Sequence, residues 1–151
     1  MRGVTRLRWF NDLVRLEIIL WERVDARLRA DHGVSMAQFE ALLAVADSGR
    51  DAVRVGDLAQ ALAITVGGAS KLADRVVASG LLRRDPDPDD RRASRLALTA
   101  DGRAALRAAT TSYEKCLAEL LDPVLTETER EGMHAVVSRL LEAARPTGPG
   151  G

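Results

Sequence analysis

The order of the patterns in residues 53–99 is the sequence feature that most limits the fold. Two short helical segments, Gly56 to Leu62 and Val66 to Ser79, are joined by the three residues Ala63-Ile64-Thr65. Two apolar strand patterns then flank the segment DPDPDDRRA, whose prolines and aspartates are typical of a loop. Two helices, a short turn and a hairpin predict a winged helix-turn-helix lobe, in which the hairpin is the wing.

Amphipathic helix patterns lie on both sides of this lobe. Residues 5–48 predict two helices, the first from Thr5 to about Ala30, with an apolar stripe broad enough for burial on more than one side. Residues 100–145 predict two more helices, and 146–151 a disordered tail. A winged helix needs only three helices, so the first and the last two require another surface, and a homodimer formed by the terminal helices provides it. The fold class is mainly α with a small β wing.

Composition places limits on where and how the chain works. The 151 residues include 22 Lys+Arg and 22 Asp+Glu, so the formal net charge is zero. Any DNA function must therefore come from local charge, because no global basic excess is present. The longest apolar run, Ala41 to Ala46, is far shorter than the roughly 20 residues that span a bilayer. Without a signal-peptide pattern, the expected location is the cytoplasm.

The residues do not form a recognisable catalytic or metal-binding motif. The chain lacks a P-loop, a dinucleotide glycine fingerprint, a nucleophile with a suitably spaced histidine, and a zinc-ligand pattern. We therefore expect no enzymatic activity, no cofactor and no metal. The single cysteine, Cys116, excludes an internal disulfide, and its helical spacing predicts a buried, inert thiol.

The stretch KLADRVVASGLLRRDPDPDDRRASRLALTADG resembles the matching part of MarR-family (multiple antibiotic resistance regulator) transcription factors. The shared features are a recognition helix, a Gly80-Leu81 turn, a wing tip with Asp90 and Arg92, a Leu98-Thr99 pair and the later Gly102. The resemblance implies a two-fold symmetric dimer that binds a pseudo-palindromic operator. It also implies a repressor that a small phenolic or other lipophilic effector releases.

The helix after the turn is expected to read DNA. A recognition helix places its first turns against base edges in the major groove. Two adjacent glycines there cost about 1 kcal/mol each relative to alanine, which close backbone approach to DNA would explain, although the pair would also simply soften the helix start. The basic residues also fit ordinary solvated charge. The expected DNA-binding residues of this helix are Thr65, Gly67, Gly68, Ser70, Lys71 and Arg75.

The loop of the hairpin mixes both charges. Asp87, Asp89 and Asp90 would repel phosphates, and Arg91 and Arg92 offset only part of that repulsion. The family resemblance suggests that Asp90 pairs with Arg92 and orients its guanidinium toward the narrow minor groove, a role that suits arginine better than lysine. A solvated charge run is the plain alternative. Three further basic residues fit either phosphate contacts or partners within the wing: Arg83, Arg84 and Arg95.

An effector is expected where the first helix, the second helix and the helix after the wing meet the DNA-binding lobe. Trp21, His32, Phe39 and Tyr113 are the nearby residues able to stack on or hydrogen-bond a ligand, although each also fits a core or surface role. Arginine and tryptophan on the first helix favour an anionic aromatic acid.

Two other functions are compatible with the same lobe. One is a constitutive or architectural DNA-binding protein without an effector. The other is a winged-helix protein-interaction module that has lost DNA binding, which the presence of Lys71 and Arg92 disfavours.

Overall fold

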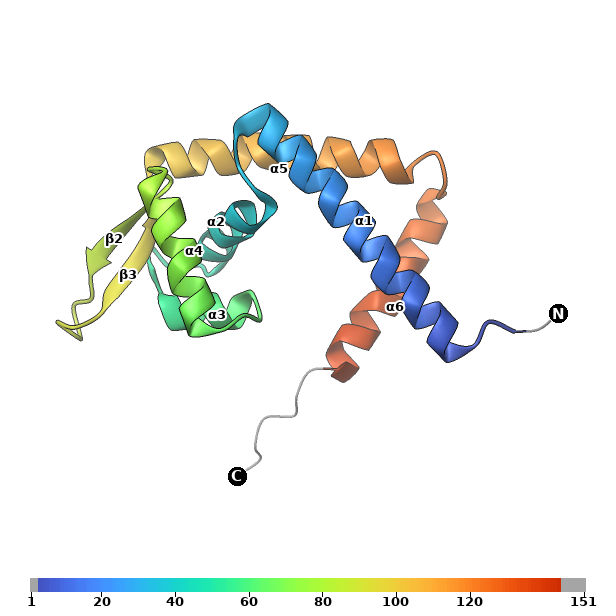
Figure 1. Cartoon of the computed structure of the whole chain (residues 1–151), viewed down its shortest axis with the longest axis horizontal. Coiled ribbons are helices and arrows are strands. Elements are labelled where there is room, and N and C mark those ends of the chain that lie inside the picture. The colour runs from blue at the N-terminus through green and yellow to red at the C-terminus, as the bar shows by residue number, and fades with distance from the viewer. Residues whose placement is uncertain (1–2, 145–151) are drawn as a thin grey trace, which may run out of the picture. The chain divides into compact units, whose positions relative to one another are not determined.

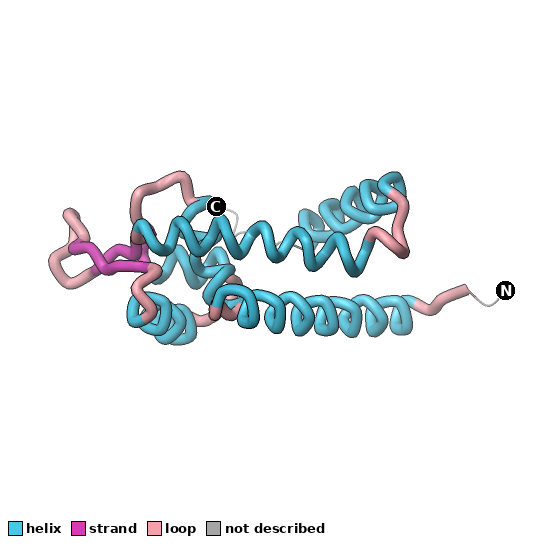
Figure 2. Tube along the Cα trace, turned by 90° about the horizontal axis from the view of Figure 1, so that it is seen from above, coloured by secondary structure: helices cyan, strands magenta, loops and turns pink. Residues whose placement is uncertain are grey.

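The computed structural model describes residues 3–144, which contain six α-helices and a small three-stranded sheet (Figure 1). Figure 2 shows the strands gathered in one small region of a largely helical chain. The predicted fold class is thereby confirmed. Contacts divide the chain into two compact units, one ending at Cys116 and the other beginning at Leu117. The elements are α1 (Arg6–His32), α2 (Met36–Asp47), β1 (Val53–Arg54), α3 (Val55–Ala61), α4 (Val66–Ala78), β2 (Leu82–Pro86), β3 (Ser94–Leu98), α5 (Ala100–Leu121) and α6 (Glu127–Ala144).

The helix starts follow from side-chain caps that the sequence indicates. Ser35 and Gln38 form a capping box at α2, and the Thr65 hydroxyl accepts a hydrogen bond from the Gly68 amide at α4. At α6, the Thr126 amide donates to the Glu129 carboxylate over 2.8 Å, as in a second capping box. None of the described helices is long and apolar enough to cross a membrane. The tail 146–151 lies outside the described residues.

The sheet differs from the sequence expectation in two places. It has the antiparallel order β1-β3-β2, and the two-residue strand β1, which pairs Val53 with Leu96, was too short to give a sequence pattern. Asp85 and Pro86, expected in the loop, instead extend β2, where Pro86 pairs with Ser94. Proline is tolerated there because β2 is an edge strand.

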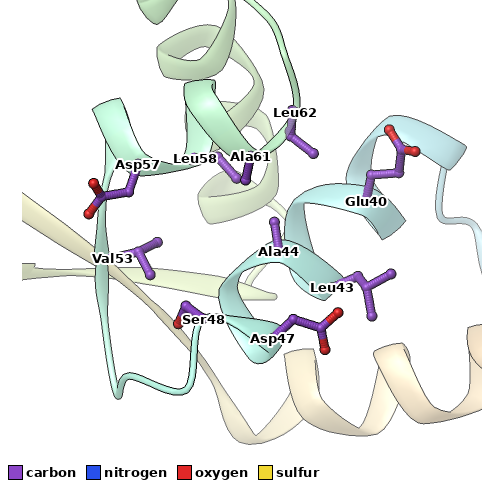
Figure 3. A pocket seen from close by; sticks show the side chains of 10 residues that line it. All are labelled: Glu40, Leu43, Ala44, Asp47, Ser48, Val53, Asp57, Leu58, Ala61 and Leu62. Carbon is purple, nitrogen blue, oxygen red and sulfur yellow. The ribbon is translucent and has the colours of Figure 1, made fainter. Parts of the chain in front are cut away.

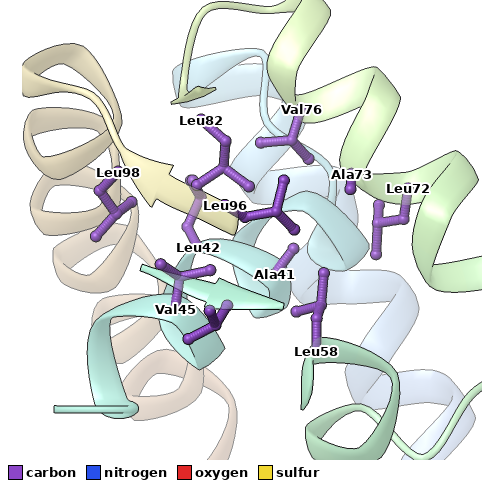
Figure 4. Close-up of a cluster of buried hydrophobic side chains, with 11 residues drawn as sticks. Ala41, Leu42, Val45, Leu58, Leu72, Ala73, Val76, Leu82, Leu96 and Leu98 are labelled. Atoms are coloured by element: carbon purple, nitrogen blue, oxygen red, sulfur yellow. The ribbon is translucent and has the colours of Figure 1, made fainter. Parts of the chain in front are cut away.

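The apolar core of the first unit lies between α2, α4 and the strands (Figure 4). The inward face of α4 is the one that the helical period predicts, except that Val77 is only partly buried. Burial of one face of α4 leaves its opposite face turned toward solvent. The buried members of the core are Ala41, Leu42, Val45, Val53, Leu58, Leu72, Ala73, Val76, Leu82, Leu96 and Leu98.

One set of contacts holds the residues before β2 against the residues that follow β3 at the start of α5. The Thr99 amide donates to the Leu81 carbonyl over 3.1 Å, and the Thr99 hydroxyl donates to the Gly80 carbonyl over 2.7 Å. Gly80 has φ +78°, and a Cβ built on Gly102 would lie 1.9 Å from the Leu81 carbonyl oxygen. The spaced Gly-Leu, Leu-Thr and Gly features therefore form one structural contact, which holds together the start of β2 and the end of β3.

The terminal helices carry apolar side chains that the single chain does not cover. In α1 only Val24 and Leu28 are buried, whereas Trp9 is 47% and Phe10 57% exposed. In the single chain, buried packing of α1 is confined to its C-terminal part, and burial of the rest against a dimer partner stays a prediction. None of the described residues of α6 is buried. Its exposed apolar residues are Met133, Val136, Val137, Leu140 and Leu141.

Candidate nucleic-acid interface

The six residues expected on the recognition helix lie at the start and along the outer side of α4. Lys71 and Arg75 are exposed, and neither forms an ion pair with another described residue. Gly68 and Ser70 are half-buried, and Thr65 is exposed at the N-cap. The hydroxyl of Thr65 accepts from the Gly68 amide over 3.0 Å, which leaves its own proton free to donate to a ligand.

The two glycines of α4 are not equivalent. A Cβ added at Gly67 would meet nothing within 4 Å, so the protein itself gives no reason for glycine there. A Cβ at Gly68 would lie 3.1 Å from the Thr65 hydroxyl oxygen, so the cap itself restricts this position. Of the two glycines, only Gly67 therefore needs an explanation outside the protein chain, such as close approach to DNA.

Sequence reasoning missed an apolar residue at the same helix start. Val66, the first residue of α4, is 61% exposed, and Ile64 in the preceding turn is 42% exposed. Val66 could have been predicted from its position directly after Thr65, because a recognition helix presents its first turn to bases. Exposed methyl groups there are suited to contact the methyl group of thymine.

The wing tip is a tight turn that presents two arginines. The Ala93 amide donates to the Asp90 carbonyl over 3.0 Å, which places Arg91 and Arg92 at the centre of the turn, both exposed. The Asp90 carboxylate accepts from the Arg92 backbone amide over 2.9 Å. In the DNA-free chain Asp90 therefore contacts Arg92 through its backbone amide and not through the guanidinium, because the short aspartate side chain caps its own turn. The pairing with the guanidinium on DNA stays a prediction.

Asp87 is a wing carboxylate with no exposed side-chain surface. It accepts from the Arg54 Nε over 2.7 Å, from the Arg95 Nε over 3.1 Å and from the Asp89 backbone amide over 2.9 Å. The Arg54 hydrogen bond, the Asp89 amide and Arg95 hold the pKa of Asp87 far below its usual range despite burial. The expectation that Asp87 repels phosphate is therefore wrong, since its charge is buried and neutralised. Arg54, which sequence reasoning missed, joins β1 to the wing.

The three arginines left open by the sequence all have partners within the protein. Arg83 pairs with Asp85 over 3.0 Å, Arg84 pairs with Asp74 of α4 over 2.5 Å, and Arg95 reaches Asp89 as well as Asp87. Asp74, on the exposed side of α4, thus links that helix to the wing. In contrast, the four cations on the outer side of α4 and at the wing tip have no hydrogen-bonding side-chain partner among the described residues: Lys71, Arg75, Arg91 and Arg92.

The residues expected near an effector are partly brought together. Phe39 is buried and packs edge to face on Tyr113, with ring centroids 5.2 Å apart. The Nε2 atom of His32 lies 2.8 Å from the hydroxyl of Ser112, the neighbour of Tyr113. Trp21 is 37% exposed, and nothing in the described residues places it with the other three. The effector site stays a prediction. Separately, the predicted burial of Cys116 is confirmed.

Helices α3 and α4, joined by a short turn and followed by the β2–β3 hairpin, define a winged helix-turn-helix protein. A model of the MarR family matches residues 32–93. An uncharacterized protein of Mycobacterium tuberculosis is 30% identical over 120 residues, which cover 78% of this chain and 81% of that protein. The chain belongs to the MarR family of transcriptional regulators.

Two further proteins show how far the similarity extends. The transcriptional repressor MprA of Escherichia coli is 27% identical over 122 residues, which cover 81% of this chain and 68% of MprA. A MarR family transcriptional regulator from Streptomyces coelicolor, whose crystal structure is a complex with DNA, superposes with a TM-score of 0.82 at 22% identity. That match covers 97% of this chain and 93% of the other, and it shows a shared fold.

Proposed function

We propose that this protein is a homodimeric repressor that binds a palindromic DNA operator in the cytoplasm and is released by a small effector. The main support for DNA binding is that some cations of α4 and the wing are paired within the protein and others are not. Lys71, Arg75, Arg91 and Arg92 are exposed without partners in the described chain, whereas Arg54 and Arg95 are held by Asp87. Unpaired cations gathered on α4 and the wing tip supply local positive charge to a chain of zero net charge.

The start of α4 fits the major groove. Thr65 offers a hydroxyl, Val66 offers methyl groups, and Gly67 offers a backbone that DNA is able to approach closely. Lys71 and Arg75 lie further along the exposed side, where their charges are available to phosphates or base edges. At the wing tip, Arg92 has a free guanidinium for the negative potential of a narrow minor groove.

The repressor part of the proposal draws on the relative MprA, which is a transcriptional repressor. The experiment selects duplexes from a random library with the full chain and then measures binding by fluorescence anisotropy at several salt concentrations. We expect a palindromic sequence, salt-sensitive affinity, and half-sites about 34 to 36 Å apart. A reporter gene placed behind the selected sequence should be repressed. Selection that enriches no sequence, or a reporter that is activated, contradicts the proposal.

The dimer is proposed from the uncovered apolar stripes of α1 and α6. Exposed apolar surface of this extent marks an interaction site in soluble proteins. Truncation before Thr126 removes all of α6 and should leave a monomeric or aggregating product, measured by sedimentation velocity. A well-behaved dimer that binds the operator would show that α6 is not part of the interface.

The effector part is tested on the preformed protein–DNA complex. Salicylate, a simple anionic aromatic acid, is titrated into the complex while DNA release and tryptophan fluorescence are read in parallel. Release of DNA together with a fluorescence change supports a site near Trp21, His32, Phe39 and Tyr113. A fluorescence change without release favours the constitutive DNA-binding alternative, since ligand binding would then be uncoupled from the operator.

A further inference from the structure

A groove with a volume of about 430 Å³ lies between α2 and α3 in the first unit (Figure 3). Its apolar lining includes Leu43 and Ala44 of α2 and Leu58 and Leu62 of α3. Figure 3 shows the Ala44 side chain pointing from α2 toward α3, between the two helices. The volume falls within the range of pockets that hold small organic molecules. Neither the predicted DNA-binding residues nor the predicted effector residues line this groove.

The charged residues that line the groove are all acidic. They are Glu40 and Asp47 of α2 and Asp57 of α3, and the lining residues include no arginine, lysine or histidine. Asp57 already has partners, because its carboxylate accepts from the Arg54 amide over 3.4 Å and lies 3.5 Å from the Arg50 guanidinium. The carboxylates of Glu40 and Asp47 form no hydrogen bond or ion pair with another described residue. Negative charge on the α2 side of the groove is therefore uncompensated.

Glu40 has a second acidic neighbour. The side chain is half-buried, and burial together with Glu17 of α1 raises its pKa. The same carboxylate also contributes to the raised pKa of Tyr113, for which burial is the larger cause. A positive charge placed beside Glu40 would relieve this repulsion, whereas a negative charge would add to it.

We propose that the α2–α3 groove binds an amphipathic organic cation, with its apolar body on Leu43, Ala44 and Leu58 and its charge beside Glu40 and Asp47. The groove offers apolar area and uncompensated carboxylates in one place, which is the combination that such a cation requires. The ligand class is opposite in charge to the aromatic acid expected elsewhere in the chain. Cation binding in this groove is a property of the protein without DNA, so it is measured independently of operator binding.

The test compares two ions of nearly equal size and shape but opposite charge. Tetraphenylphosphonium and tetraphenylborate are each titrated into the full-length protein by equilibrium dialysis. We expect one phosphonium bound per chain, with an affinity at least about tenfold higher than that of the borate. Tetramethylammonium, which has the charge without the apolar body, should bind more weakly than the phosphonium. Equal affinity for the phosphonium and the borate would overturn the proposal, as would failure of both to bind.

Variants locate the binding. Glu40→Gln keeps the shape of the side chain and removes its charge, so it should weaken phosphonium binding about fivefold to tenfold and leave borate binding no weaker. Ala61→Leu, at an exposed position lining the groove on α3, should weaken binding of both ions by filling the groove. Glu131→Gln, an exposed acid of α6, is the matched control and should change neither. Phosphonium affinity that is unchanged in Glu40→Gln and Ala61→Leu would place the cation elsewhere and refute the assignment.

Discussion

The recognition helix α4 and the wing place their cations in different ways. In α4, the helical period alone turns Lys71 and Arg75 away from the buried residues Leu72 and Val76. In the wing, orientation depends on polar contacts, because β2, β3 and the tip contain both acids and arginines in close succession. There the buried carboxylate of Asp87 holds two arginines, and the exposed arginines of the tip are the ones without partners.

This difference separates two kinds of sequence information. A helix face is specified locally, so a substitution on the exposed side of α4 changes one contact and little else. The wing is specified by a network, so one substitution there alters several side chains together. We therefore expect substitutions in α4 to change DNA binding one contact at a time and substitutions in the wing to change it through the whole network.

The largest effect is expected at the wing tip itself. Arg92→Ala should lower operator affinity about 5-fold to 150-fold, because loss of a specific arginine contact to DNA costs about 1–3 kcal/mol. Arg107→Ala is the matched control, since Arg107 is an exposed arginine of α5 outside the proposed interface. The measurement is fluorescence anisotropy at physiological salt. Equal affinities for Arg92→Ala and the unmodified protein would remove the wing tip from the interface.

A smaller loss is expected when the network is broken away from DNA. Asp87→Asn keeps the shape of the side chain but removes the charge that holds Arg54 and Arg95. Operator affinity should fall about tenfold while affinity for unrelated duplex DNA holds or rises, because two arginines are released. The readout is therefore the ratio of the two affinities. A parallel fall in both would mean that the variant protein has lost its fold, which circular dichroism would detect.

The lowered pKa of Asp87 determines the pH range in which this carboxylate affects the wing. The folded-state pKa of Asp87 is lowered, so its contribution is fully present above the ordinary aspartate pKa of 3.8 and is lost as the pH falls through the folded value. The specificity ratio should thus show no transition caused by Asp87 between about pH 5 and pH 8. A transition in that range that Asp87→Asn abolishes would contradict the ion-pair assignment.

The sequence predicted the helix better than the wing for a physical reason. Apolar spacing indicates the buried side of α4, because a helix face depends on residues within one or two turns. The partners of Asp87 include Arg54, 33 residues earlier, in a strand too short to have a pattern. Nothing local distinguishes Asp87 from Asp89 or Asp90. Composition therefore indicated a charged wing, and only the fold determined which arginines are free.

Asp90 provides a milder test of how the tip is built. If its carboxylate caps the Arg92 amide, then Asp90→Asn should keep near-normal operator affinity, because an asparagine oxygen accepts the same hydrogen bond. Asp90→Ala should lower affinity only about threefold to fivefold, through loss of the turn. The comparison is made by anisotropy with both variants. If Asn is as damaging as Ala, the charge of Asp90 matters and a pairing with the Arg92 guanidinium forms on DNA.

The smallest change tests the helix side of the comparison. Gly67→Ala adds one methyl group at a site where nothing lies within 4 Å, so it should raise the free energy of unfolding by up to about 1 kcal/mol. The same methyl should lower operator affinity about twofold to fivefold if the α4 backbone approaches DNA closely. Gly56→Ala in α3 is the control, since its added Cβ also meets nothing within 4 Å and Gly56 is not among the predicted DNA-binding residues, so it should not weaken DNA binding. Thermal unfolding and anisotropy together measure both quantities. A Gly67→Ala protein that is more stable and binds as tightly as before would mean that Gly67 only softens the helix start, because close approach cannot leave the added methyl without cost.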